Sequence, residues 1–204
     1  MFTRLLMFTL YFIKLQEDDE KMNNLAKLFK TQKLLDNRIV DKHNLHGQDL
    51  LPKKILALQV ELGELAQNWR GFKFWSRDQE PRTELFDEEY DLIHMESVGL
   101  EQKNPLLEEY VDCLHFILSI GNDLELNIEL YTILPIEHKT ILDQFSRTYY
   151  VISDLEHDPS QEELIAFLQY FLGLGEMLGF TPEQIEQSYY QKNAINHQRQ
   201  TDHY

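Results

Sequence analysis

Cysteine is nearly absent from this sequence, which contains only Cys113 among its 204 residues. A single cysteine excludes an intramolecular disulfide framework and a structural zinc site built from cysteines. It is consistent with a reducing compartment, so we expect a cytoplasmic protein. Glycine and proline are also scarce, with 8 and 6 residues, which leaves few breaks in helical segments.

Positive charge is scarce too. The chain has 19 Lys and Arg residues against 35 Asp and Glu residues, and its formal net charge is −16. Such a field repels a phosphate backbone, so we expect no nucleic-acid partner. A small nucleotide remains compatible with this charge, because divalent cations can bridge acidic side chains and phosphate groups.

A long hydrophobic run is also missing. The apolar stretch at residues 5–15 is too short to span a membrane, and no small-residue cleavage site of a secretory signal follows it. We therefore expect no membrane association. An acidic stretch and Met22 come next, so we interpret residues 1–21 as an N-terminal extension, upstream of the true start if that is Met22, and residues 22–204 as one domain.

Strand signals are few, whereas apolar residues recur at helical spacing along most of the chain. The expected fold is therefore all-α, a helical bundle. We place helices at residues 22–41, 52–70, 104–123, 137–157, 161–178 and 182–200. Residues 77–103 are acidic and irregular, and we expect a long loop there.

The first chemically informative segment is KKILALQVELGELAQNW, which carries Glu61 and Glu64 beside an apolar stripe. Carboxylates three residues apart are neighbours on one helix surface and repel each other unless a positive charge lies between them. Taken alone, such a pair is more often a solvated flank of a helix than a site.

A second acidic pair, Glu109 and Asp112, lies in PLLEEYVDCLHFILSIGNDL, a helix that is apolar around most of its circumference. A buried carboxylate without a partner is costly, and the helix offers no Lys or Arg near Asp112. Two such pairs on two helices make a set of hard oxygen ligands that suits magnesium or manganese. Iron would prefer Glu-x-x-His motifs, and we expect His115 to be rotated away from the carboxylates.

The C-terminal segment YYQKNAINHQRQTDHY places Lys192, Asn193, Asn196 and Arg199 on one helix face. Amides can read a base edge or a sugar hydroxyl, while Lys and Arg suit phosphate oxygens. A frayed terminal helix with solvated polar residues would show the same pattern, so this face alone decides nothing.

Together these segments resemble the dimeric, all-α dUTPase family, part of a wider group of helical nucleoside triphosphate pyrophosphohydrolases that includes MazG-like enzymes. The wider group shares the Glu-x-x-Glu and Glu-x-x-Asp pairs. The narrower family is indicated by QKLLD, FKFW, EEYVDCLHFILS and KNAINHQRQTDHY. The similarity runs from about Met22 to the last residue, and it implies a homodimer.

The resemblance also implies roles for individual residues. The four carboxylates Glu61, Glu64, Glu109 and Asp112 would bind more than one Mg²⁺ ion per active site, with Mn²⁺ as an alternative, and Glu61 would be the general base. Substrate would contact Gln32, Lys73, Trp75, Lys192, Asn193, Asn196, Arg199 and Tyr204. Among these, Gln32 and Asn196 match nucleoside-reading positions. His203 replaces a glycine that often precedes the final tyrosine, which puts the role of Tyr204 in doubt.

The implied activity is that of a dUTP diphosphatase, in which Mg²⁺-activated water attacks the α-phosphate of dUTP, and of dUDP as well, to give dUMP. An aromatic wall against the 2′ position would come from Phe72, Phe74 or Phe116. Two alternatives stay open. One is a related pyrophosphohydrolase of different base specificity. The other is a non-enzymatic acidic helical interaction protein, which would not need Asp112 inside its most apolar helix.

Overall fold

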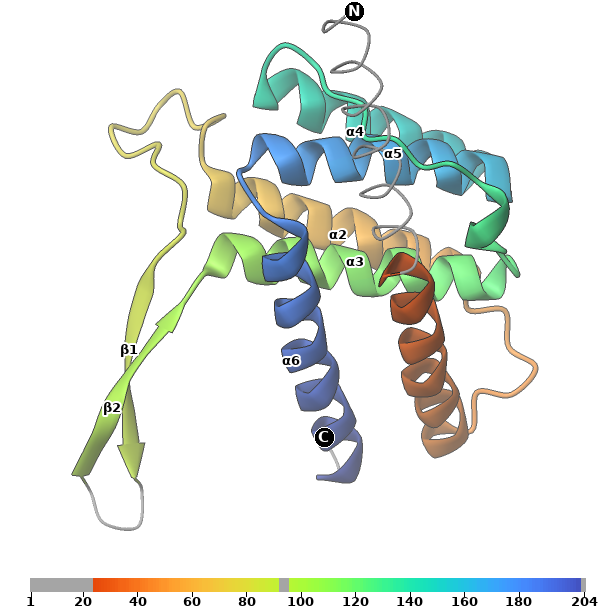
Figure 1. Cartoon of the computed structure of the whole chain (residues 1–204), viewed down its shortest axis with the longest axis horizontal. Coiled ribbons are helices and arrows are strands. Elements are labelled where there is room, and N and C mark those ends of the chain that lie inside the picture. The colour runs from red at the N-terminus through yellow and green to blue at the C-terminus, as the bar shows by residue number, and fades with distance from the viewer. Residues whose placement is uncertain (1–23, 92–95, 203–204) are drawn as a thin grey trace, which may run out of the picture.

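A computed structural model describes residues 24–91 and 96–202 of the chain, and within them the expected all-α bundle is confirmed. The interpretation of residues 1–21 as an extension and the role of Tyr204 lie outside the described residues. A helix at residues 24–43 comes first. The others, shown in Figure 1, are α2 (Leu51–Trp69), α3 (Pro105–Asp123), α4 (Ile141–His157), α5 (Gln161–Met177) and α6 (Pro182–Thr201), with a short 3₁₀ turn at Ile128–Leu130.

Four of these helices begin at a side chain that caps the first turn. Asn104, Thr140, Ser160 and Thr181 each accept a hydrogen bond from the backbone N–H three residues further on. Such caps satisfy N–H groups that have no partner inside the helix. The predicted start of the fourth helix at residue 137 is therefore wrong by four residues, because Thr140 fixes the start of α4 at Ile141.

Helices α2 and α3 pack side by side through the centre of the molecule, with α4 and α5 on one side of them (Figure 1). The apolar stripe of α2 is fully buried, and α3 is buried around most of its circumference, as the sequence predicts. Tyr110 of α3 stacks on Phe171 of α5 at 4.2 Å between ring centroids. Burial of this core fixes the acidic residues beside the stripe of α2 against α3.

Helix α5 buries Phe167, Leu168 and Phe171 completely in the bundle. Among the described residues, no single helix is both long enough and apolar enough to cross a membrane. Only α5 and α6 taken together meet those criteria, and a bend of 108° separates them.

The N-terminal helix and α6 both cross α3 and project from the bundle in the same direction (Figure 1). The first half of the N-terminal helix is anchored on α3, where Phe29 is buried and its carbonyl accepts a hydrogen bond from the Asn122 amide at 3.2 Å. Its second half meets α6, because Arg38 donates to Nδ1 of His197 at 3.2 Å and to the hydroxyl of Thr201 at 2.8 Å.

The loop expected at residues 77–103 is in part a β-hairpin, so that prediction is wrong for its second half. Strand β1 (Leu85–Asp91) pairs antiparallel with β2 (Glu96–Lys103), and the register is irregular at Glu89 and Tyr90. The hairpin projects away from the helices (Figure 1). Its sequence LFDEEYD lacks strict apolar and polar alternation, so a periodicity test misses strands that are joined by backbone hydrogen bonds.

Candidate active site

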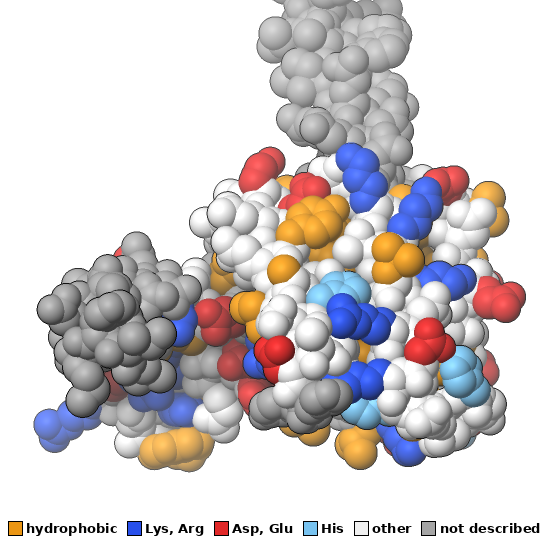
Figure 2. All heavy atoms as spheres, turned by 90° about the horizontal axis from the view of Figure 1, so that it is seen from below, with side chains coloured by type: hydrophobic (Ala, Val, Ile, Leu, Met, Phe, Trp, Pro, Cys, Tyr) orange, Lys and Arg blue, Asp and Glu red, His pale blue; other side chains and the backbone are white. Residues whose placement is uncertain are grey.

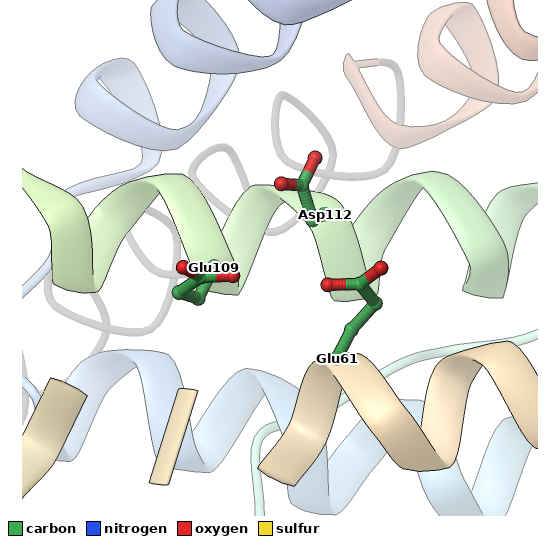
Figure 3. A group of neighbouring side chains, drawn as sticks. All are labelled: Glu61, Glu109 and Asp112. Carbon is green, nitrogen blue, oxygen red and sulfur yellow. The ribbon is translucent and has the colours of Figure 1, made fainter. Parts of the chain in front are cut away.

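Three carboxylates meet where α2 packs on α3. One oxygen each from Glu61, Glu109 and Asp112 lies within 4.8 Å of the others, and all three side chains are partly buried (Figure 3). Of the four carboxylates that the sequence analysis combined into one set of ligands, three therefore come together. Glu64 is exposed and lies outside this group of three oxygens.

Burial and neighbouring negative charges disfavour the ionised forms of Glu61 and Glu109. Burial, followed by the charges of Glu64, Asp112 and Glu61, raises the pKa of Glu109 to about 7. Burial and the charges of Asp112 and Glu64 also raise the pKa of Glu61. Glu64 is thus close enough to act on both, although its carboxylate is not in the cluster. A divalent cation would relieve this repulsion.

Two neighbouring side chains partly compensate the cluster. Lys192 of α6 donates to Oδ2 of Asp112 at 2.6 Å, which supplies the cation that α3 itself lacks. Asn68 of α2 donates to Oε1 of Glu109 at 3.1 Å. Asn68 was not predicted from the sequence, although it lies four residues after Glu64 and seven after Glu61 and so shares their helix face.

The donor set is the right kind for a hard divalent cation. Carboxylate oxygens and water are the ligands that Mg²⁺ and Mn²⁺ take in proteins. Within the described residues, this is the group of Asp, Glu, His and Cys side chains that comes close enough together to hold an ion. His115 does not belong to the group, so the group offers only oxygen atoms to a cation.

A pocket of about 420 Å³ opens beside the cluster, between the N-terminal helix, α2, α3 and α6. Figure 2 views the molecule from the side on which the N-terminal helix and α6 end, where Lys, Arg and His side chains gather. The predicted residues that line the pocket are Gln32, Glu61, Asp112, Lys192, Asn196 and Arg199. It is also lined by residues that were not predicted to bind substrate, among them Asp36, Lys53, Lys54, His115 and Ser119.

Gln32 is almost fully buried, with 3% of its surface exposed, and its amide is engaged on both sides. Oε1 accepts hydrogen bonds from the Tyr189 hydroxyl at 2.9 Å and from His115 Nδ1 at 2.7 Å. Nε2 donates to Oδ1 of Asp36 at 2.8 Å. The sequence contained a signal for Asp36, since residues four apart face the same side of a helix.

Other predicted substrate contacts lie apart from this pocket. Lys73 and Trp75 are in the segment after α2 and do not line it, and Trp75 is 65% exposed with its ring edge against Phe72 and Phe74. Asn193 is buried next to Tyr189 and is not part of the pocket wall.

Of the three aromatic residues considered as a wall against the 2′ position, Phe116 lines the pocket, whereas Phe72 and Phe74 do not. Phe116 lies on α3, four residues after Asp112, so it shares a helix face with a carboxylate of the cluster. Of the three, only Phe116 therefore lies in the wall of this pocket.

Comparison with known protein families agrees with this geometry. A family model described as dUTPase matches residues 24–104 and 97–204, which covers most of the chain. No curated protein matches the chain significantly. The matched residues include the helices that carry the three carboxylates and all four helices that form the pocket. The chain therefore belongs to the all-α dUTPase family of hydrolases, with dUTP diphosphatase as its function.

Proposed function

We propose that this dUTPase binds Mg²⁺ through Glu61, Glu64, Glu109 and Asp112 and hydrolyses dUTP to dUMP and pyrophosphate by attack of water on the α-phosphate. The observation that carries the proposal is the meeting of three carboxylate oxygens within 4.8 Å beside the pocket. Such an arrangement is unfavourable without a cation and fits one well. Bound Mg²⁺ would neutralise the triphosphate and lower the pKa of water.

The pocket has separate groups for phosphate and nucleoside. Lys192 and Arg199 are its cationic groups on α6, and Lys192 lies against Asp112 at the carboxylate end. A Lys ammonium has three N–H donors, so Lys192 can hold Asp112 and still donate to a phosphate oxygen. Asn196 lies between Lys192 and Arg199 on the same helix face, where its amide suits a sugar or base.

Glu61 is the residue that we assign as general base. It lies on α2 opposite the two carboxylates of α3 (Figure 3) and lines the pocket. Because burial and neighbouring charges raise its pKa, its carboxylate accepts a proton more readily than an ordinary glutamate does. Its place is therefore suited to removing a proton from water held between the cluster and the α-phosphate.

The substrate is tested by incubating the purified protein with Mg²⁺ and each deoxynucleoside triphosphate in turn, and by measuring release of monophosphate and pyrophosphate. We expect dUTP to be consumed, with dUDP as a second substrate, and dCTP, dATP and dGTP to be spared. Comparable hydrolysis of all four bases would instead favour a pyrophosphohydrolase of broad specificity. Absence of any hydrolysis would favour a binding protein.

We also propose that the enzyme is a homodimer. Helices α2 and α4 are neighbours, joined by a hydrogen bond between Gln59 and Glu156, and they expose large apolar side chains. Val60 is 51% exposed and Tyr150 is 57% exposed. Burial of such side chains against a second copy would stabilise a symmetric dimer.

The dimer is tested by light scattering after gel filtration. We expect a mass of twice the 24.4 kDa of one chain, and we expect Tyr150→Glu to reduce it to one chain. Leu130→Glu is the matched control, because Leu130 is 77% exposed but lies outside α2 and α4. A wild-type mass of one chain would contradict the proposal.

A further inference from the structure

We propose that Nε2 of His115 accepts the N3–H group of the uracil ring and thereby makes the pocket reject cytosine. This inference rests on the proposed function, because it concerns how the same pocket selects its base. It assigns a specificity-determining role to a residue that the sequence analysis considered only as an unsuitable iron ligand.

Neighbouring groups fix the orientation of the Gln32 amide. Its NH₂ group faces the carboxyl group of Asp36, and its oxygen therefore faces Tyr189 and His115. An amide oxygen only accepts hydrogen bonds, so the His115 nitrogen at 2.7 Å must carry the proton. In a neutral imidazole the second nitrogen then has a free lone pair. Gln32 thus fixes Nε2 of His115 as an acceptor.

The imidazole of His115 remains neutral. Only 6% of its surface is exposed, and burial, together with the charge of Lys192, lowers its pKa to about 3. The imidazole ring is also held in place, because it stacks on Tyr189 with 4.4 Å between centroids and 24° between planes. The nitrogen therefore presents one fixed lone pair at physiological pH.

The lone pair of His115 Nε2 has no hydrogen-bond partner among the described residues. Nε2 of His115 is buried, and none of them donates a hydrogen bond to it. A buried acceptor without a donor destabilises the fold, so proteins rarely keep one without a use. His115 also lines the pocket, although Nε2 itself is buried. A ligand that packs directly against the imidazole would supply the missing donor.

His115 lies one helical turn away from the carboxylate of Asp112. It follows Asp112 by three residues on α3, which is about 4.5 Å along the helix axis. With Mg²⁺ bound to the carboxylates, the triphosphate would lie at that end of the pocket, and the next turn of α3 would then face the nucleoside. Phe116, Ser119 and Asn196 also line the pocket. We place the base among these residues, beside His115.

The chemistry of the base completes the argument. Uracil carries a hydrogen on N3 and cytosine does not, so N3 is a donor in uracil and an acceptor in cytosine. The lone pair of His115 attracts the first and repels the second. A site built to pair with a particular donor rejects an analogue that lacks it, because the buried group is left unpaired. Thymine has the same N3–H group as uracil, so His115 does not separate these two. Gln32 is then a positioning residue that acts through His115.

Two substitutions test the assignment. In His115→Asn, the amide nitrogen replaces Nδ1 and can still donate to Gln32, but nothing replaces Nε2. In His115→Gln, the longer amide places its oxygen near the position of Nε2. For His115→Asn we expect the ratio of kcat/KM for dUTP over dCTP to fall by about 10-fold to 100-fold, and for His115→Gln we expect part of it to return.

The dUTP over dTTP ratio is the internal control and should stay unchanged in both variants. Equal losses of kcat/KM for dUTP and dCTP in His115→Asn would show a merely structural role and would overturn the assignment. A wild-type enzyme without preference for dUTP would instead count against the proposed function itself, so the two failures are distinguishable.

A direct measurement on the wild-type protein is the ¹⁵N NMR spectrum of its histidines. We expect a protonated Nδ1 and an unprotonated Nε2 for His115 in the free enzyme, and we expect dUMP, but not dCMP, to shift the Nε2 resonance. A protonated Nε2, or equal shifts with both nucleotides, would overturn the assignment.

Discussion

A Glu61→Gln enzyme should hydrolyse dUTP about 10³-fold more slowly than the wild type, yet remain folded. Loss of a general base costs 10²-fold to 10⁴-fold in rate, and an amide is also a poorer ligand for Mg²⁺ than a carboxylate. Because burial and the charges of Asp112 and Glu64 raise the pKa of Glu61, its charge is unfavourable in the metal-free fold. The Tm of the metal-free variant should therefore equal or exceed that of the wild type.

Glu162→Gln is a suitable control, because this substitution also removes one negative charge. Glu162 is exposed in the first turn of α5 and does not line the pocket. Its rate should match the wild type. Retention of more than a tenth of the activity by Glu61→Gln would remove Glu61 from the mechanism. A fall in its metal-free Tm would show that the charge of Glu61 stabilises the fold, contrary to our electrostatic argument.

Removal of divalent cations with EDTA should abolish dUTP hydrolysis, and added Mg²⁺ should restore it. The effect of Mg²⁺ on stability should also depend on pH. The pKa of Glu109 is raised from 4.5 to about 7, so protonation of this group favours the folded state. This contribution to the free energy of unfolding is fully present below the pKa that Glu109 has in the unfolded chain, and it is lost as the pH rises through about 7. The metal-free protein therefore loses stability over this range.

Mg²⁺ binds the ionised carboxylate and competes with the proton. The rise in Tm caused by Mg²⁺, measured by scanning calorimetry, should thus be larger about one pH unit above the pKa of Glu109 than one unit below it. Glu109→Gln should remove most of that difference. Equal rises at both pH values in the wild type would exclude Glu109 as a ligand, and hydrolysis in the presence of EDTA would refute the metal-dependent mechanism.

The sequence was sufficient for the helices and for the carboxylates, for one physical reason. Both depend on spacing within a helix, and an i, i+3 pair such as Glu109 and Asp112 keeps its relation in any all-α fold. The amphipathic stripe of α2 and the apolar circumference of α3 also agree with the burial of these two helices, which pack against each other. Three carboxylates then meet at their contact.

Contacts between distant segments were beyond reach. The partner of Asp112 is Lys192, which lies 80 residues away on α6, and the partner of Gln32 is His115, 83 residues away. Nothing in the local pattern of either segment specifies such a pair. The hairpin was missed because its acidic strands lack the strict alternation of apolar and polar residues that a periodicity test detects. Glu64 follows Glu61 by three residues on α2 but is exposed, because a step of three residues also rotates the side chain around the helix axis.

The contacts between the N-terminal helix and α6 have a consequence for the local stability of these two helices. At the far ends of these helices, Arg38 contacts His197 and Thr201, and His43 pairs with Gln200 at 3.1 Å, all at exposed positions. Water replaces such hydrogen bonds at little cost in free energy. By contrast, the near ends of these two helices, which pack on α3, are buried in the core, where Phe29 and Tyr189 lie. Fraying of the far tips should therefore cost less free energy than separation of the near ends, and it would leave the carboxylates on α2 and α3 in place.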